Sequence, residues 1–149
     1  MPYVKNLLER KGNTVWTILP GASIRDALLL MTDKKVGALV VSEAGKICGI
    51  FSERDYARQV AKTDNLSLDL PVSAVMSHPV YFARPDQTVE ECMRIMTARR
   101  IRHLPVLQDD ALAGIISIGD VVKSLINEKE MTIRHLENFI AGSSVSSSG

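Results

Sequence analysis

The sequence is poor in the residues that cross-link a chain or anchor it in a membrane. Its two cysteines, Cys48 and Cys92, lie in apolar surroundings without Cys-x-x-Cys spacing, which indicates reduced thiols and excludes a disulfide scaffold. No apolar run approaches the roughly 20 residues that span a bilayer, and the first 12 residues are too polar for a signal peptide. We therefore expect a cytoplasmic protein that has no membrane partner.

Charge of neither sign is in excess. The 18 basic and 17 acidic residues leave a formal net charge of +1. A general nucleic-acid binder carries a basic excess, so this balance argues against nucleic acid as a partner. If basic residues bind an anion, they must then be clustered on one part of the surface.

Motifs of catalysis and of metal binding are missing as well. The stretch GIISIGD from Gly114 superficially resembles a P-loop, but Asp120 stands where a P-loop has lysine. The sequence contains no G-x-G-x-x-G, H-E-x-x-H or G-x-S-x-G, and its histidines and cysteines show no metal-ligand spacing. We therefore predict no catalytic residues, no metal and no enzymatic activity.

What the sequence does contain is an internal repeat. GIFSERD from Gly49 and GIISIGD from Gly114 are nearly the same phrase, 65 positions apart. Aligning the chain with itself at this shift matches further residues without a gap, among them Met31 with Met96. Because a repeat decides the fold, the 149 residues are expected to form two similar units.

Each copy predicts the order β-α-β-β-α. The first copy has an extended piece over 15–19, a helix after Ser23, a hairpin turning at 43–46 and a helix over 53–62; the second repeats them at 80–84, after Thr88, around 109–110 and over 118–128. One unit of about 60 residues buries little surface. We therefore predict an α/β (α+β) fold in which two repeats pack with pseudo-twofold symmetry and leave equivalent clefts between them.

Further segments flank and join the repeats. The expected divisions are an N-terminal helical segment (1–14), the first repeat (15–64), a linker (65–79), the second repeat (80–127), a C-terminal helix (128–141) and a disordered Ser/Gly tail (142–149). The two terminal helices are amphipathic and belong to neither repeat. We expect them to cover apolar surface in the same chain or across a homodimer.

The repeated phrase has two interpretations. Ser52 with Asp55, and Ser117 with Asp120, have the spacing of a capping box, in which serine caps a helix and the acid bonds back to the chain. Alternatively, the helix N-terminus and the serine bind a phosphate, while the carboxylate holds the two hydroxyls of a ribose. The residues alone leave both interpretations open.

The pattern also resembles a known family. A glycine, two apolar residues, serine, two variable residues and aspartate, closing a β-α-β-β-α unit that occurs twice with IRHLPV before the second hairpin, is similar to the tandem cystathionine-β-synthase (CBS) domain pair, or Bateman module, of the stand-alone type. The resemblance covers residues 15–126. It implies a module that senses AMP, ADP, ATP or NAD(H), less readily S-adenosylmethionine, and regulates another protein.

Carried over by position, the resemblance implies two ligand sites, with Asp55 and Asp120 on ribose hydroxyls. The first comprises Thr17, Ile18, Val36, Gly37, Ala38, Ile50, Ser52, Glu53, Arg54 and Asp55. The second comprises Tyr81, Phe82, Ala83, Ile101, Arg102, His103, Pro105, Ile115, Ser117, Ile118, Gly119 and Asp120. Lys35, Arg99 and Arg100 would form a basic rim that attracts phosphates, although cations there also suit the helix C-termini.

The two copies differ where an adenine would lie. Gly37 and Ala38 leave an open slot in the first, whereas Phe82, Arg102 and His103 in the second could stack on or bond to a base. We therefore expect the two sites to differ in affinity or ligand. The function expected is adenine-nucleotide sensing that controls an unidentified separate protein; the alternative is a dimerisation or interaction scaffold in which the serines and aspartates are only caps.

Overall fold

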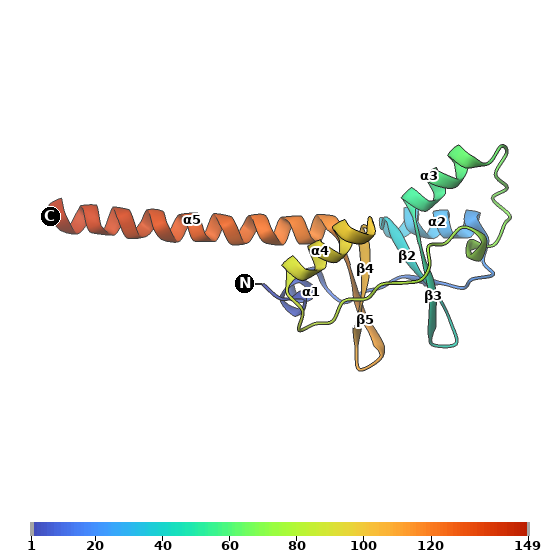
Figure 1. The fold of residues 1–149 in the computed structure, drawn as a ribbon, viewed down its shortest axis with the longest axis horizontal. Helices are drawn as coiled ribbons and strands as arrows, with labels where there is room; N and C mark the ends of the chain where they lie inside the picture. Colours follow the sequence, from blue (N-terminus) through green and yellow to red (C-terminus); the bar gives the residue numbers. More distant parts are fainter. Residues whose placement is uncertain (1, 149) are drawn as a thin grey trace.

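The computed structural model describes residues 2–148, with side chains for residues 2–141. Its elements are α1 (Val4–Lys11), β1 (Thr17–Ile18), α2 (Ile24–Lys34), β2 (Ala38–Glu43), β3 (Lys46–Ser52), α3 (Glu53–Lys62), the 3-10 helix η1 (Val72–Ala74), α4 (Val89–Arg99), β4 (His103–Gln108), β5 (Ala111–Ser117) and α5 (Ile118–Ser148). The two hairpins stand side by side with their turns at the same end (Figure 1). This arrangement confirms the expected mixed α/β fold of two repeats.

The first helix of each repeat begins and ends in the same way. Ser23 Oγ accepts a hydrogen bond from the backbone N–H of Asp26 at 3.0 Å, and Thr88 Oγ1 accepts the equivalent bond at 3.1 Å. Each helix ends at a residue in the left-handed conformation, Lys35 with φ of 57° and Arg100 with φ of 55°. Matching start and stop signals therefore produce matching helices.

The hairpins also share their register, including a bulge at equivalent places. β2 pairs with β3 and β4 with β5, both antiparallel. The copies differ at the preceding extended piece, because β1 pairs with β2 whereas no strand forms over the described residues 80–84. In the first repeat Val40 N–H donates to Trp16 O at 3.1 Å. Its counterpart Pro105 has no N–H to donate, so this ladder cannot extend.

Each repeat has a core of its own, and a segment outside the repeat completes it. Val72 of η1 is fully buried in the first core, and Val4 of α1 is fully buried in the second. The docking bonds match as well: Val72 N–H donates to Ala22 O at 2.7 Å, and Val4 N–H donates to Gln87 O at 2.9 Å. Of the two placements expected for the N-terminal helix, α1 takes the one within the same chain: it completes the core of the second repeat, as the linker segment completes the core of the first.

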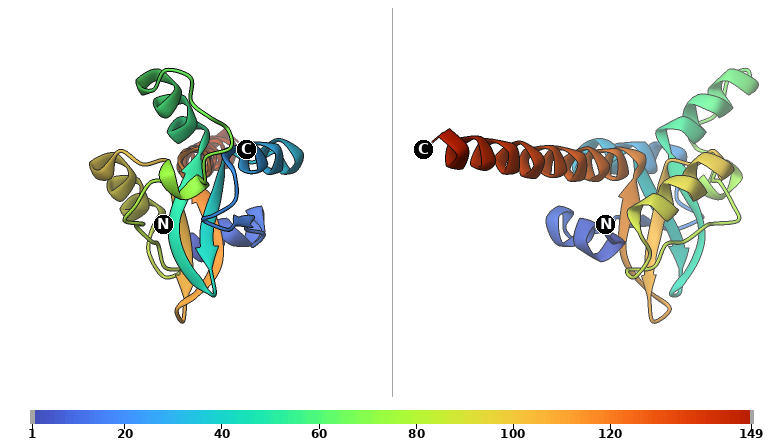
Figure 2. Two further views of the ribbon diagram at one scale, coloured as in Figure 1. Left: turned by 90° about the vertical axis from the view of Figure 1, so that its right-hand side faces the viewer. Right: turned by 60° about the vertical axis from the view of Figure 1, so that its left-hand side comes forward.

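The C-terminal part also differs from the expectation. Instead of one helix ending near residue 128, a second over 128–141 and a disordered tail, the backbone forms one helix, α5, through Ser148 (Figures 1 and 2). No proline or glycine interrupts the sequence between Gly119 and Gly142, so nothing ends the helix earlier. The last residue, Gly149, lies outside the described residues. None of the described helices is both long and apolar enough to span a membrane.

Candidate functional site

Both repeated phrases form capping boxes at the start of the second helix of their repeat. In the first, the N–H of Asp55 donates to Ser52 Oγ at 3.2 Å, while the N–H of Ser52 donates to Asp55 Oδ2 at 2.9 Å. In the second, the N–H of Asp120 donates to Ser117 Oγ at 3.1 Å and the N–H of Ser117 donates to Asp120 Oδ2 at 2.8 Å. The capping interpretation is therefore confirmed. It still leaves acceptor positions on the carboxylates, because each carboxylate can accept about four hydrogen bonds.

The first aspartate also binds the linker. Ser77 Oγ donates to Asp55 Oδ1 at 2.6 Å, and Asp55 is 7% exposed. The backbone of Ser77 pairs with Ile50 of β3 through two bonds of 2.8 and 3.0 Å. A β-carbon at Gly49 would lie only 2.6 Å from Met76 Sδ and 2.9 Å from Ser77 O, so glycine is required for this close approach. The linker thus forms one wall beside Asp55.

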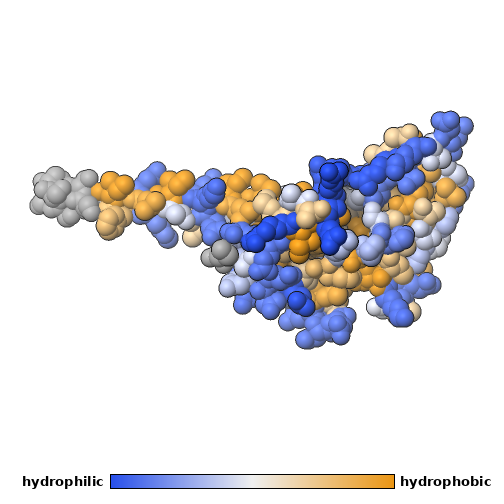
Figure 3. All heavy atoms as spheres, viewed as in Figure 1, coloured by the Kyte–Doolittle hydropathy of each residue, from blue (hydrophilic) through white to orange (hydrophobic). Residues whose placement is uncertain are grey.

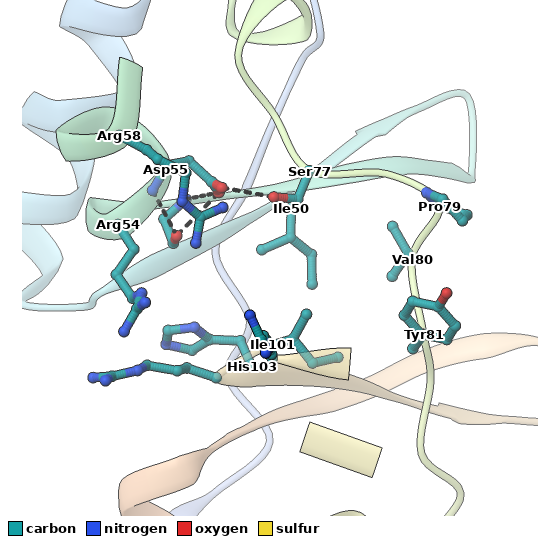
Figure 4. Close-up of a pocket in the computed structure, with 13 residues that line it drawn as sticks. Ile50, Arg54, Asp55, Arg58, Ser77, Pro79, Val80, Tyr81, Ile101 and His103 are labelled. Atoms are coloured by element: carbon teal, nitrogen blue, oxygen red, sulfur yellow. Dashed lines mark hydrogen bonds between the residues drawn. The ribbon is translucent and has the colours of Figure 1, made fainter. Parts of the chain in front are cut away.

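A pocket opens between the repeats at Asp55. Its empty volume is about 560 Å³, open to solvent. The lining residues come from the end of β3 and the first part of α3, from the linker and the start of the second repeat, and from the loop before β4 with the first residue of β4: Ile50, Ser52, Arg54, Asp55, Arg58, Ser77, Pro79, Val80, Tyr81, Arg100, Ile101, Arg102 and His103 (Figure 4). We call this the Asp55 pocket. It is a joint product of both repeats and the segment that joins them.

The Asp55 pocket is strongly basic. Four of its lining residues are arginines, Arg54 and Arg58 one turn apart on α3 and Arg100 and Arg102 after α4, whereas Asp55 is the acid among the lining residues. Within the part of the chain that the structure describes, none of these four arginines forms an ion pair. An anion of several charges would find unpaired guanidinium groups there, and guanidinium is suited to phosphate.

His103 lies at the junction of the two repeats. Burial lowers its pKa below the usual 6.5, and the charge of Lys11 lowers it further, against the opposing effects of Asp120 and Asp55. A β-carbon at Gly37 would lie 3.7 Å from His103 Nε2, which shows how closely the two repeats approach here. The imidazole is therefore neutral at pH 7 and faces groups of both halves.

The second aspartate has a different environment. Lys11 Nζ, at the end of α1, lies 2.6 Å from Asp120 Oδ2 and donates to Ile115 O at 2.8 Å. Burial acts to raise the pKa of Asp120, but the bonds from Lys11 and Ser117 outweigh it and bring the pKa below 3.8. The space beside Asp120 is lined by α1 and α5, including Arg10 and Lys123, and contains none of the adenine-slot residues expected for it. A cation of the chain itself thus holds Asp120.

The structure regroups the expected site residues. Ile50, Ser52, Arg54 and Asp55 of the first set line the Asp55 pocket, and they do so together with Tyr81, Ile101, Arg102 and His103 of the second set rather than with their own slot. The cause is tertiary: the end of β3 in one repeat faces the start of β4 in the other. Each aspartate was grouped with residues of its own repeat, and no tertiary contact could be read from the sequence.

The remaining expected residues lie outside this pocket. Val36, Gly37 and Glu53 line a separate shallow hollow with Lys35, on the first repeat. Ala83 is fully buried in the second core, where its backbone bonds to Pro105 and Leu107, so it cannot serve as a wall for a base. The others do not line the Asp55 pocket: Thr17, Ile18, Ala38, Phe82, Pro105, Ile115, Ser117, Ile118 and Gly119.

The expected basic rim divides in the same way. Arg100 lines the Asp55 pocket, whereas the guanidinium of Arg99 lies over the ring of Tyr81, 4.8 Å from its centroid. Sequence reasoning missed Arg58, Ser77 and Lys11. Arg58 could have been found, because it follows Arg54 by one helical turn; the two others approach the aspartates from segments that carry no motif.

Comparison with known proteins finds relatives along most of the chain. The family model described as CBS domain matches residues 10–62 and 72–127. The CBS domain-containing protein CBSX3, mitochondrial, of Arabidopsis thaliana is 35% identical over 136 residues, which are 88% of this chain and 66% of that protein. The crystal structure of the CBS-domain protein ATU1752 of Agrobacterium tumefaciens shares 46% identity at a TM-score of 0.78, over 82% of this chain and 98% of that one.

A third similarity concerns a liganded structure. The CBS domain pair of protein MJ0100, solved in complex with 5′-methylthioadenosine and S-adenosyl-L-methionine, superposes with a TM-score of 0.74 over 86% of this chain and 98% of that one. The identity is 22%. At this identity the similarity shows a common fold, and the ligands are those of that protein.

Proposed function

Because the chain belongs to the CBS domain family and contains a pair of these domains, a ligand-binding regulatory module, we propose that it senses an adenine nucleotide, bound in the Asp55 pocket. The observation that carries this proposal is that one carboxylate and four arginines, none of which forms an ion pair within the described part of the chain, line the same pocket between the repeats. Phosphates would bind the arginines, and a ribose would bind the carboxylate. The regulated partner is a separate protein whose identity the chain does not reveal.

Asp55 is suited to a ribose because one of its oxygens is only lightly engaged. Oδ2 accepts the two bonds from Ser52, whereas Oδ1 accepts the single bond from the Ser77 hydroxyl. A hydroxyl can rotate away, so a ribose hydroxyl can join Ser77 at Oδ1 or replace it. The helix cap at Oδ2 stays intact in either case.

The charge of the pocket favours phosphate-bearing ligands over S-adenosylmethionine. Arg54 and Arg102 line the pocket from different repeats, so a chain of phosphates would bridge the two halves. The sulfonium group of S-adenosylmethionine is a cation and would be repelled by the same arginines. ATP, ADP and NAD(H) therefore fit better than the adenosyl ligands bound by MJ0100.

The adenine has an apolar wall available. Ile50, Val80 and Ile101 line the pocket beside the ring of Tyr81, on the side away from Arg54 (Figure 4). Arg99 holds the Tyr81 ring from outside through its cation–π contact. A planar base between these side chains would be buried on both faces, which is the usual arrangement of a nucleotide base in a protein pocket.

The cleft at Asp120 should bind ligand more weakly, because its lining contains none of the expected adenine-slot residues and Lys11 already pairs with Asp120 Oδ2. A ribose that bound at Asp120 Oδ2 would displace this ion pair and weaken the hold of Lys11, which also donates to Ile115 O. This agrees with the expectation that the two sites differ. We propose one high-affinity site per chain.

Regulation follows from the position of the Asp55 pocket. Its walls belong to both repeats and to the linker, so a bound nucleotide favours the relative placement in which all three contact it. A partner that binds this placement better than the unliganded one is thereby controlled. A cytoplasmic location stays a prediction, and the Arabidopsis relative is named as mitochondrial.

Calorimetric titration with AMP, ADP, ATP, NAD(H) and S-adenosylmethionine tests the proposal. We expect the dissociation constant to fall as the number of phosphates rises, and to increase with salt. Arg102→Ala should weaken ATP binding by about 10- to 100-fold. Arg94→Ala, which removes an exposed arginine of α4 outside the pocket, should change nothing. Failure of the wild-type protein to bind any of these ligands would overturn the proposal.

One observation favours a second candidate, a scaffold without ligand. Both aspartates make complete capping boxes, which account for the repeated phrase with no nucleotide present. A scaffold would keep its partner affinity unchanged on addition of nucleotide. A sensor would change it, and the same partner-binding measurement with and without ATP separates the two.

A further inference from the structure

The outer part of α5 carries an exposed apolar stripe. α5 extends well beyond the two repeats (Figures 1 and 2), and apolar side chains alternate with polar ones along it (Figure 3). The α5 stripe consists of six residues that are 38–73% exposed: Val122, Ile126, Ile133, Leu136, Phe139 and Ile140. Exposed apolar surface of this extent marks an interface.

The spacing of the stripe indicates what covers it. Ile126, Ile133 and Ile140 recur every seven residues, and Val122, Lys129 and Leu136 form the second row of the same heptads. Apolar residues in two such rows are typical of a helix that packs along another helix. A contact over about 20 residues would be about 30 Å long, which is long enough for a dimeric coiled coil.

We propose that the α5 stripe binds the α5 stripe of a second copy of this chain, with the two helices antiparallel. About a twofold axis near Met131, Ile126 of one copy packs on Leu136 of the other, and Ile140 packs on Val122. A mobile non-helical partner would not match the heptads. This interface is independent of the Asp55 pocket, so either proposal can fail without the other.

Charge decides the direction of the helices. In the antiparallel arrangement Lys123 of each copy lies beside Glu137 of the other, which forms two attractive pairs, and Glu130 of each copy lies beside Glu130 of the other, which forms one repulsive pair. A parallel arrangement in register would place Lys129 of one copy against Lys129 of the other in the middle of the interface. It would also set Glu130 and Glu137 beside uncharged residues, Leu125 and Thr132. The antiparallel arrangement has two attractive pairs against one repulsive pair, whereas the parallel arrangement has a repulsive pair and no attractive one, so antiparallel packing is favoured.

Sedimentation equilibrium of the full chain tests whether the stripe is the interface. We expect a dimer at about 10 µM. Ile133→Lys should raise the dimer dissociation constant more than about 100-fold, whereas Asn138→Lys, which adds the same charge on the opposite face of α5, should leave it unchanged. Circular dichroism checks that both variants keep their helices. A monomeric wild type, or equal weakening by both variants, would overturn the proposal and leave the stripe to a different protein or a lipid surface.

Charge reversal tests the antiparallel arrangement. Lys123→Glu and Glu137→Lys should each weaken the homodimer by roughly tenfold, because both pairs become repulsive. Mixing the two single variants should restore wild-type association, since both pairs of the mixed dimer are again attractive. In a parallel dimer these positions do not meet and mixing restores nothing, which would refute the arrangement.

Discussion

Replacing each aspartate of the capping boxes by asparagine separates the capping role from the binding role. Asparagine has one acceptor oxygen instead of two and carries no charge. In Asp55→Asn the side chain cannot keep all three bonds that it now accepts from Ser52 and Ser77. We expect the free energy of unfolding to fall by about 1–3 kcal/mol. Asp120→Asn loses the partly exposed pair with Lys11, and we expect about 1 kcal/mol.

The ligand response distinguishes these variants. ATP at about 100 times its dissociation constant stabilises the wild-type fold by about 2.7 kcal/mol, which for a chain of this size raises Tm by roughly 5–10 °C. Asp55→Asn should lose most of this increase, because a charged acceptor of the ribose is gone. Asp120→Asn should retain it, because that carboxylate already binds Lys11.

Thermal melting followed by circular dichroism, with and without ATP, measures both effects in one experiment. Each variant is compared with its own unliganded melt, so a lower starting stability does not disguise the ligand response. An Asp55→Asn protein that keeps the full increase in Tm would refute the role of this carboxylate in binding. Equal loss in both variants would show that the two clefts are equivalent, against the asymmetry proposed here.

Three further predictions concern packing and pH. Gly49→Ala should lower the free energy of unfolding by about 1–3 kcal/mol in urea titrations, and Gly114→Ala by less, since a β-carbon meets a backbone oxygen at the former and only the flexible Leu8 side chain at the latter. Leu7→Ala, in the second core, should lower the free energy of unfolding by about 2–5 kcal/mol in the same assay. If α1 did not belong to this core, the substitution would have little effect. The lowered pKa of His103 means that the unfolded chain takes up a proton first as pH falls below about 6.5; stability should therefore drop between pH 7 and pH 5, and His103→Gln should flatten that dependence.

Local signals predicted the elements of this fold well. Capping pairs such as Ser23 with Asp26 bond to their own backbone within one turn, so their spacing in the sequence is sufficient to place a helix start. The hairpin turns and the 65-residue shift are equally local or purely sequential. The sequence also shows that Pro105 stands at the position equivalent to Val40, which donates its N–H to Trp16 O. That this proline prevents a strand over 80–84 could be predicted only by knowing that residues 80–84 lie beside β4.

The candidate site was predicted in part, for the same reason. Ser52 and Asp55 were identified because capping a helix and binding a ligand at its N-terminus use the same residue types at the same spacing. Arg102 and His103, which line the same pocket as Asp55, were placed in the other predicted set, since they reach this pocket across the interface between the repeats. The hydrophobic periodicity of the sequence does not indicate which loop of one repeat faces which helix of the other.

The sequence alone thus determined the duplicated α/β architecture, its helix caps and its two aspartates, because these depend on bonds among residues a few positions apart. Only the tertiary structure decided that α1 completes the second core, that Lys11 holds Asp120, and that four arginines line the pocket at Asp55. Burial and charge act through space over a few ångströms, whatever the separation along the chain. Two nearly identical sequence segments therefore have different surroundings: Asp55 lines an open pocket, whereas Asp120 is paired with Lys11 of the same chain.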